Sequence, residues 1–174
     1  MGTEPGDIKL VRDLMTVGVP TCAPHTPVMD VARRLLEEGL EAIVVQNEEG
    51  HAVGVISQDD LVRAYGRADQ QALMASDVMT EGVPQIPPDI PLAAAAQIMR
   101  DLGVRVLYLT HNADGITYPA ASLSYHHLLR HLAAGDTAGL KDLGIKAERE
   151  PPLATFFRRR DEARRRASQS GSRD

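Results

Sequence analysis

The sequence has few aromatic residues and a single cysteine. Among its 174 residues there is no Trp, and there are two Phe and four Tyr, so a flat ligand would lie mostly between aliphatic side chains. The one cysteine, Cys22, excludes an intrachain disulfide and is consistent with a reducing compartment. No catalytic motif surrounds Cys22, and we expect it to be a small buried apolar residue.

Long apolar stretches are also missing. No run approaches the roughly 18 residues of a membrane-spanning helix. The first ten residues, MGTEPGDIKL, lack the apolar segment of a signal peptide, and residue 6 is Gly rather than the Ser or Thr of a myristoylation signal. The chain has 43% apolar and 25% charged residues, as is usual for a globular protein. We expect a cytoplasmic protein of one domain or two very small ones.

Charge is distributed unevenly along the chain. Residues 1–140 carry 9 Lys or Arg and 18 Asp or Glu, whereas residues 141–174 carry 10 and 6. An acidic body thus bears a basic tail with Arg runs at 158–160 and 164–166. Such a tail could pack on the acidic body of a second copy, contact nucleic acid non-specifically, or dock on another protein.

The chain contains an internal repeat. The segment DLMTVGVPTCAPHTPVMDVARRLLEEG, from Asp13, aligns without a gap with DVMTEGVPQIPPDIPLAAAAQIMRDLG, from Asp77. At an offset of 64, ten of 27 positions are identical, including the Met-Thr and Val-Pro pairs. Residues 10–134 therefore consist of two copies of one supersecondary unit.

Each copy predicts the element order β-α-β-β-α. A short extended piece after Val19-Pro20 precedes a helix that starts at Pro27, with Thr26 as its cap. The further elements are strands 42–45 and 53–56 and helix 57–65 in the first copy, and strands 104–109 and 120–123 and helix 124–132 in the second. We predict an α/β (α+β) fold in which two repeats, 8–70 and 71–134, pack through their sheets, followed by a linker and Arg-rich tail at 135–174.

One short motif raises a question of role. In GVISQDDL, from Gly54, Ser57 is followed three residues later by Asp60. This spacing is a capping box, in which each side chain bonds a free backbone N–H at a helix start. The same geometry places a carboxylate beside a helix N-terminus, where it could accept two hydrogen bonds from a vicinal diol. The two roles do not exclude each other.

The repeat, the Met-Thr and Val-Pro segments and the GVISQDDL motif together resemble the cystathionine β-synthase (CBS) domain pair, or Bateman module. The resemblance covers about residues 10–134. It implies a sensor whose two pseudo-symmetric sites often bind AMP, ADP, ATP or S-adenosylmethionine, and pairs that commonly form disc-like homodimers. Asp60 would hold the ribose hydroxyls and Ser57 would lie by the ribose or phosphate.

The resemblance also implies further contacts. Val19 and Pro20 would flank the base, Ile43 and Val44 would complete its slot, and Gly54 would allow close approach of the ligand. Arg105 could reach a phosphate in the Asp60 site, or it could be a solvated Arg at a helix–strand junction. We expect no metal site.

The second copy departs from the motif, because Ala121, Ser124 and His127 replace Gly54, Ser57 and Asp60. A neutral His has one acceptor and cannot hold a diol in a bidentate manner. We therefore predict one competent site, built on Asp60, and a second site that is empty, degenerate or adapted to another ligand.

No nucleophile–base pair, metal cluster or phosphate loop indicates an enzyme. We expect a non-catalytic regulatory module that binds an adenosine-containing ligand and signals to an unidentified protein. The acidic body favours AMP, ADP or a cationic adenosyl ligand over ATP. Two alternatives are a structural dimerisation module without a ligand and a nucleic-acid-binding regulator that uses the tail.

Overall fold

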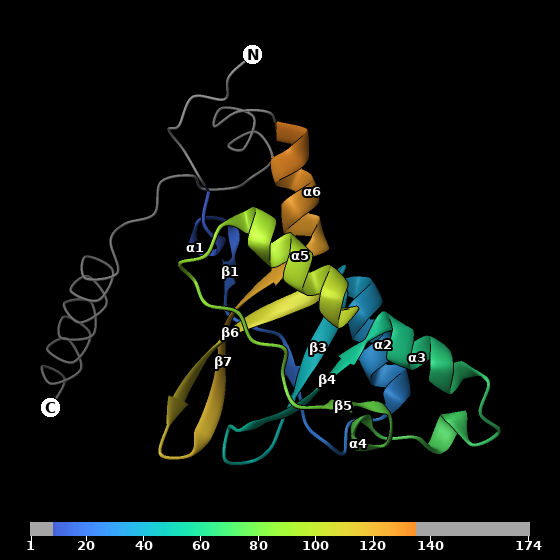
Figure 1. Cartoon of the computed structure of the whole chain (residues 1–174). Helices are drawn as coiled ribbons and strands as arrows, with labels where there is room; N and C mark the ends of the chain where they lie inside the picture. The colour runs from blue at the N-terminus through green and yellow to red at the C-terminus, as the bar shows by residue number, and fades with distance from the viewer. Residues whose placement is uncertain (1–8, 135–174) are drawn as a thin grey trace, which may run out of the picture.

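Two small sheets form the centre of the molecule (Figure 1). The structure is a computed structural model that describes residues 9–134; the predicted linker and basic tail lie outside these residues. One sheet has the strand order β2-β3-β4-β5 and the other β1-β7-β6. The strands are β1 (Thr16–Val17), β2 (Thr21–Cys22), β3 (Ala42–Gln46), β4 (Ala52–Ser57), β5 (Thr80–Glu81), β6 (Val106–Ala113) and β7 (Ile116–Ser124).

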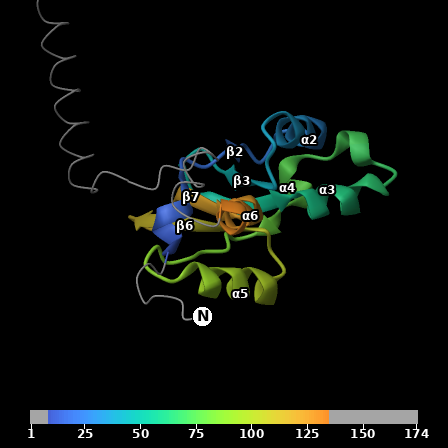
Figure 2. The same cartoon turned by 90° about the horizontal axis from the view of Figure 1, so that it is seen from above.

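Helices cover the outer faces of the sheets. They are α1 (Val11–Leu14), α2 (Val28–Glu37), α3 (Gln58–Tyr65), α4 (Ala75–Val78), α5 (Leu92–Leu102) and α6 (Tyr125–Ala134), with a 3₁₀ turn η1 at Gln70–Ala72. Seen from above, α2 and α5 lie on opposite sides of the strands (Figure 2). The predicted α/β class and the tandem β-α-β-β-α repeat are confirmed.

The first repeat follows its apolar pattern. Helix α2 buries Val31 and Leu35, which pack with Ile43, Val45 and Ile56 of the hairpin β3–β4. The predicted Thr26 cap is wrong. Pro27 is the N-cap and has no side-chain hydrogen bond, whereas the Thr26 hydroxyl accepts the N–H of Ala23 at 3.1 Å. The Thr26 hydroxyl therefore stabilises the turn at residues 23–26 and does not cap the helix.

The second hairpin is longer than predicted. Strands β6 and β7 pair in antiparallel fashion from Val106↔Ser124 to Ala113↔Ile116. Pro119 lies inside β7 opposite Thr110, next to an irregularity in the register between Leu109 and Thr110. A break in the ladder accommodates a residue that has no N–H to donate, so the proline did not end the strand.

The repeats exchange short strands. Strand β1, from the first repeat, pairs with β7, and β5, from the second repeat, pairs with β4. The Met-Thr segment of each copy thus completes the sheet of the other copy. This exchange places Thr80 and the residues after it beside the end of β4 and the start of α3.

A shared core joins the two sheets. Its buried members come from β3, β4 and β6, with partly buried Val19 and Val83 packed against it; they are Ala42, Val44, Ala52, Val55, Val106 and Tyr108. Gly54 is required by this packing, because a Cβ there would stand 2.7 Å from the Thr80 carbonyl oxygen and 2.8 Å from Met79 Sδ. Strand β5 can therefore lie directly against β4.

Among residues 9–134, no helix combines the length and apolar character needed to cross a membrane.

Candidate ligand site between the repeats

A cavity of ≈ 530 Å³ opens where the two repeats meet. Its lining comes from the end of β4 and start of α3, from β5 and the segment after it, and from the starts of β3 and β6. The apolar part of the wall consists of Ala42, Val55, Val83, Pro84, Leu102, Val104 and Val106. The polar part gathers around Ser57 and Asp60 and includes Arg105. Both repeats are needed to form this cavity.

Ser57 and Asp60 form the predicted capping box of α3. Asp60 Oδ2 accepts the Ser57 N–H at 2.8 Å and the Ser57 hydroxyl at 2.6 Å. The Asp60 N–H donates in return to Ser57 Oγ at 3.2 Å. The cap thus uses one oxygen of the carboxylate, and the backbone at the start of α3 is fixed by a residue of the cavity wall.

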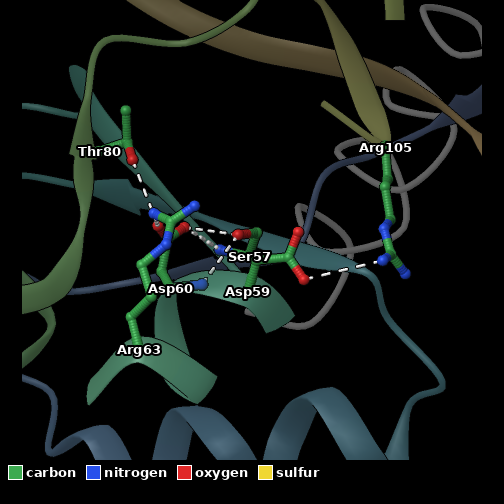
Figure 3. A network of polar contacts seen from close by, with 6 residues as sticks. All are labelled: Ser57, Asp59, Asp60, Arg63, Thr80 and Arg105. Atoms are coloured by element: carbon green, nitrogen blue, oxygen red, sulfur yellow. Dashed lines mark hydrogen bonds and ion pairs between the residues drawn. The ribbon is translucent and has the colours of Figure 1, made fainter. Parts of the chain in front are cut away.

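The other carboxylate oxygen makes weaker contacts (Figure 3). Asp60 Oδ1 lies 3.1 Å from Arg63 Nη1 and accepts the Thr80 hydroxyl at 3.4 Å. The Arg63 side chain is 76% exposed, so this ion pair contributes little. Asp60 is itself only 10% exposed. Oδ1 is therefore a sheltered acceptor whose present partners can be exchanged.

Arg105 reaches the same cavity from the second repeat. Its guanidinium lies 3.7 Å from Asp59 Oδ1, and both side chains are about half exposed. Figure 3 draws this ion pair beside the Ser57–Asp60 cap. Asp59 lies in the first turn of α3, so this ion pair links the start of α3 to the second repeat.

Three of the eight predicted site residues line the cavity: Ser57, Asp60 and Arg105. The other five do not. Ile43 and Val44 are fully buried in the cores on the two faces of β3. Val19 packs against the core between the sheets, and the Pro20 carbonyl accepts the Val44 N–H. At Gly54, Met79 and Thr80 occupy the space that a ligand would need.

The counterparts of Val19 and Pro20 take their place in the wall. Val83 and Pro84 line the Asp60 cavity because β5 crosses to the first repeat's sheet. Sequence reasoning missed Thr80, Val83 and Pro84. The signal was the Met-Thr and Val-Pro identity between the copies, but identity alone does not tell which copy serves which site.

At the equivalent place in the second repeat, His127 makes the contacts that Asp60 makes in the first. Its Nδ1 accepts the Ser124 N–H at 2.9 Å, and its Nε2 lies 2.8 Å from the Thr16 hydroxyl. Since a backbone N–H can only donate, Nδ1 is unprotonated and Nε2 carries the hydrogen. The single acceptor of the ring is used by the backbone.

The remaining candidate groups are of other kinds. Cys22 is half-buried, and burial raises the pKa of its thiol although nearby Arg34 acts in the opposite direction. The thiol is therefore protonated at neutral pH, which does not favour a nucleophile. Within the described part of the chain, no three His, Cys, Asp or Glu side chains are grouped as metal ligands would be.

Comparison with known proteins identifies the family. Residues 11–67 and 75–134 each match the CBS domain. The chain therefore belongs to the CBS-domain family and contains a tandem CBS domain pair.

Curated relatives match the same part of the chain. The chain is 30% identical over 123 residues to the arabinose 5-phosphate isomerase KdsD of Pseudomonas aeruginosa, a match that covers 69% of this chain and 37% of the isomerase. The chain spans less than half of the length of the first curated relatives it matches.

Solved structures share the fold. The CBS domain pair of protein MJ0100, in complex with 5′-methylthioadenosine and S-adenosylmethionine, has a TM-score of 0.63 at 18% identity; the match covers 75% of this chain and all of that one. CBSX2 in complex with AMP has a TM-score of 0.58 at 23% identity, with 71% and 96% covered.

Proposed function

We propose that this chain is a regulatory module, without catalytic activity of its own, that binds an adenosine-containing ligand in the Asp60 cavity and transmits its presence to a partner protein. The observation that carries the proposal is a cavity that both repeats build and that combines an apolar wall with a sheltered carboxylate oxygen. Its volume of ≈ 530 Å³ lies in the range of small-molecule sites. The ligands bound by MJ0100 and CBSX2 support the choice of adenosine compounds.

The apolar wall suits a purine. Val83 and Pro84 approach from the second repeat, and Ala42 and Val55 from the first. In a chain without Trp, aliphatic side chains and a proline ring provide the flat apolar contact that a base requires. Burying a base here removes apolar surface from water on both faces.

The two oxygens of Asp60 divide the structural and the ligand role. Oδ2 holds the cap of α3, whereas Oδ1 can exchange its bonds to Arg63 and Thr80 for the hydroxyls of a ribose. Hydrogen bonds to a charged acceptor are stronger than neutral ones. We therefore propose that Asp60 has both roles, as the cap of α3 and as a ligand-binding residue.

The group attached to the 5′ carbon of the ribose would meet charged residues. Arg105, from the second repeat, offers a guanidinium that could leave Asp59 for a phosphate or carboxylate. AMP, ADP, ATP and S-adenosylmethionine all remain candidates.

Signalling follows from the position of the cavity. A ligand held by Asp60 on one side and by Val83, Pro84 and Arg105 on the other favours one arrangement of the two repeats. Only a difference in affinity between two arrangements can drive a conformational change. The regulated protein would bind one arrangement of the repeats more tightly than the other.

Two experiments test the ligand. Mass spectrometry of small molecules released by heat denaturation would identify a ligand carried through purification. Calorimetric titration with AMP, ADP, ATP and S-adenosylmethionine should show saturable binding of at least one compound, with one site per chain. If all four fail to bind at high micromolar concentration, a structural module without a ligand is the better account.

We also propose a homodimer through α3 and α6. Val62 and Tyr65 on α3 and Leu129 and Leu132 on α6 are each at least 61% exposed. The second pair follows the first at an offset of 67, the offset that relates Ser57 to Ser124. A two-fold axis could place α6 of one copy on α3 of its partner and bury both pairs twice.

Sedimentation velocity tests the dimer. Leu132→Glu should convert it to a monomer, because two charges would be buried in the symmetric interface. The control is Leu36→Glu, at an equally exposed residue of α2 (81%) outside this surface. A monomeric wild-type chain, or a Leu132→Glu variant that still dimerises, contradicts this interface.

A further inference from the structure

Position 41 is the internal counterpart of Arg105. The two residues are related by the offset of 64 and precede β3 and β6, respectively. Both line the cavity. Where the repeat could have provided a second guanidinium, this chain therefore has the carboxylate of Glu41.

The cavity lining has an excess of negative charge. Its ionisable side chains are four carboxylates and two guanidiniums: Glu41, Asp59, Asp60, Glu81, Arg63 and Arg105. Arg63 pairs with Asp60 and Arg105 pairs with Asp59. Within residues 9–134, Glu41 and Glu81 have no ion-pair partner, so both basic groups are already engaged while two acidic groups are not.

Glu41 also has an unmet hydrogen-bonding requirement. Its Oε2 is buried and has no hydrogen-bond partner, and the same is true of the Tyr108 hydroxyl. Burial, and then the charge of Glu41, raises the pKa of Tyr108, so this hydroxyl stays neutral beside the carboxylate. A buried acceptor without a donor is costly. A ligand ammonium group could donate a hydrogen bond to Glu41, whereas a sulfonium, which has no N–H or O–H, would interact with the carboxylate through its charge alone.

We propose that Glu41 makes the Asp60 cavity selective for adenosyl compounds that carry a positive charge beyond the ribose 5′ carbon, a sulfonium or an ammonium, over adenine polyphosphates. This inference rests on the proposed adenosine site. A cation gains from Glu41 and leaves the Arg105–Asp59 pair intact. A polyphosphate brings several negative charges next to Glu41 and Glu81 and must first draw Arg105 away from Asp59.

A pair of probes isolates the sulfonium charge. S-adenosylmethionine and S-adenosylhomocysteine differ by one methyl group and the positive charge it creates. Titration calorimetry on the wild-type protein should give about tenfold tighter binding for the sulfonium, the effect of one partly screened charge pair. AMP should bind more tightly than ATP, and raising the salt concentration should narrow the difference between the sulfonium and the thioether.

Variants of Glu41 assign the effect to this residue. Glu41→Gln should bring the two affinities within about twofold of each other. Glu41→Arg should reverse the order and improve ATP binding. The control is Glu48→Gln, at an exposed residue of the β3–β4 turn outside the cavity.

The outcomes separate the two proposals. If no adenosine compound binds, the proposed function fails and the selectivity fails with it. If adenosine compounds bind but the wild-type protein prefers ATP, or treats sulfonium and thioether alike, the selectivity is wrong and the adenosine site stands. The wild-type comparison keeps this test decisive even if a Glu41 variant does not fold.

Discussion

Replacing Asp60 by Ala should separate ligand binding from folding. The substitution removes the Oδ2 acceptor of the α3 cap, and losing a capping group costs about 1–2 kcal/mol of unfolding free energy. The exposed ion pair to Arg63 adds almost nothing to that cost. For a chain of this size, the melting temperature should fall by about 3–8 °C, so the variant remains folded at room temperature.

The effect on binding should be much larger. Oδ1 would supply one or two hydrogen bonds to the ribose, each with a charged acceptor and each contributing about 1.5–3 kcal/mol. Their loss should weaken binding by at least about tenfold, which titration calorimetry against the best-bound adenosine ligand measures directly. Far-UV circular dichroism of the same samples verifies the fold.

Asp77→Ala is the matched control. Asp77 Oδ2 accepts the Met74 N–H at 2.8 Å at the start of α4, as Asp60 does at the start of α3. Asp77 does not line the cavity. This variant should lose similar stability and keep its affinity. Equal affinity losses in the two variants, or wild-type affinity in Asp60→Ala, would refute the assignment of Asp60 to the ligand.

Three further substitutions test other parts of the account. Gly54→Ala should destabilise the protein by about 1–3 kcal/mol in denaturant unfolding, because the new Cβ collides with Thr80 and Met79; unchanged stability would contradict the close packing of β5. His127→Ala should cost about 1 kcal/mol of stability and leave the ligand affinity within about threefold, so a lost ligand would reverse the choice of site. Tyr108→Phe should be at least as stable as the wild type, because it removes a buried hydroxyl without a partner.

The Tyr108 variant also has a pH signature. Burial raises the pKa of Tyr108 above its ordinary value of 10.0, so the unfolded chain loses this proton first as the pH rises. The contribution of protonated Tyr108 to the free energy of unfolding is therefore fully present below about pH 10 and is lost as the pH rises above it. Chemical unfolding between pH 9 and 11 should show a smaller alkaline loss in Tyr108→Phe than in the wild type, and equal losses would contradict this assignment.

The sequence predicted most of the fold because the repeat constrains it. Ten shared positions in 27 located two copies of one unit, and the apolar stripe of α2 and the buried run of β3 identified a helix and a central strand. The length of β7 was not predicted: the sequence indicated a strand at 120–123, whereas β7 begins at Ile116 and includes Pro119. What allowed the longer strand is an irregularity in the partner's register, which depends on pairing rather than on local propensity.

The site could be predicted only where it is local in sequence. The Ser57–Asp60 cap is decided by a spacing of three residues and was found. The apolar wall depends on an exchange of strands between the repeats, so Val83 and Pro84 line the cavity where Val19 and Pro20 were expected. Pseudo-symmetric segments look alike in sequence, and only the tertiary crossing of β5 decides which of them faces Asp60.

The most direct test of the central claim is a crystal structure of the protein grown with saturating S-adenosylmethionine or AMP. We expect electron density for the adenosine group between Val83–Pro84 and β3–β4, with ribose hydroxyls within hydrogen-bonding distance of Asp60 Oδ1. A ligand bound beside His127 instead, or an Asp60 cavity that stays empty at saturation, would contradict the account.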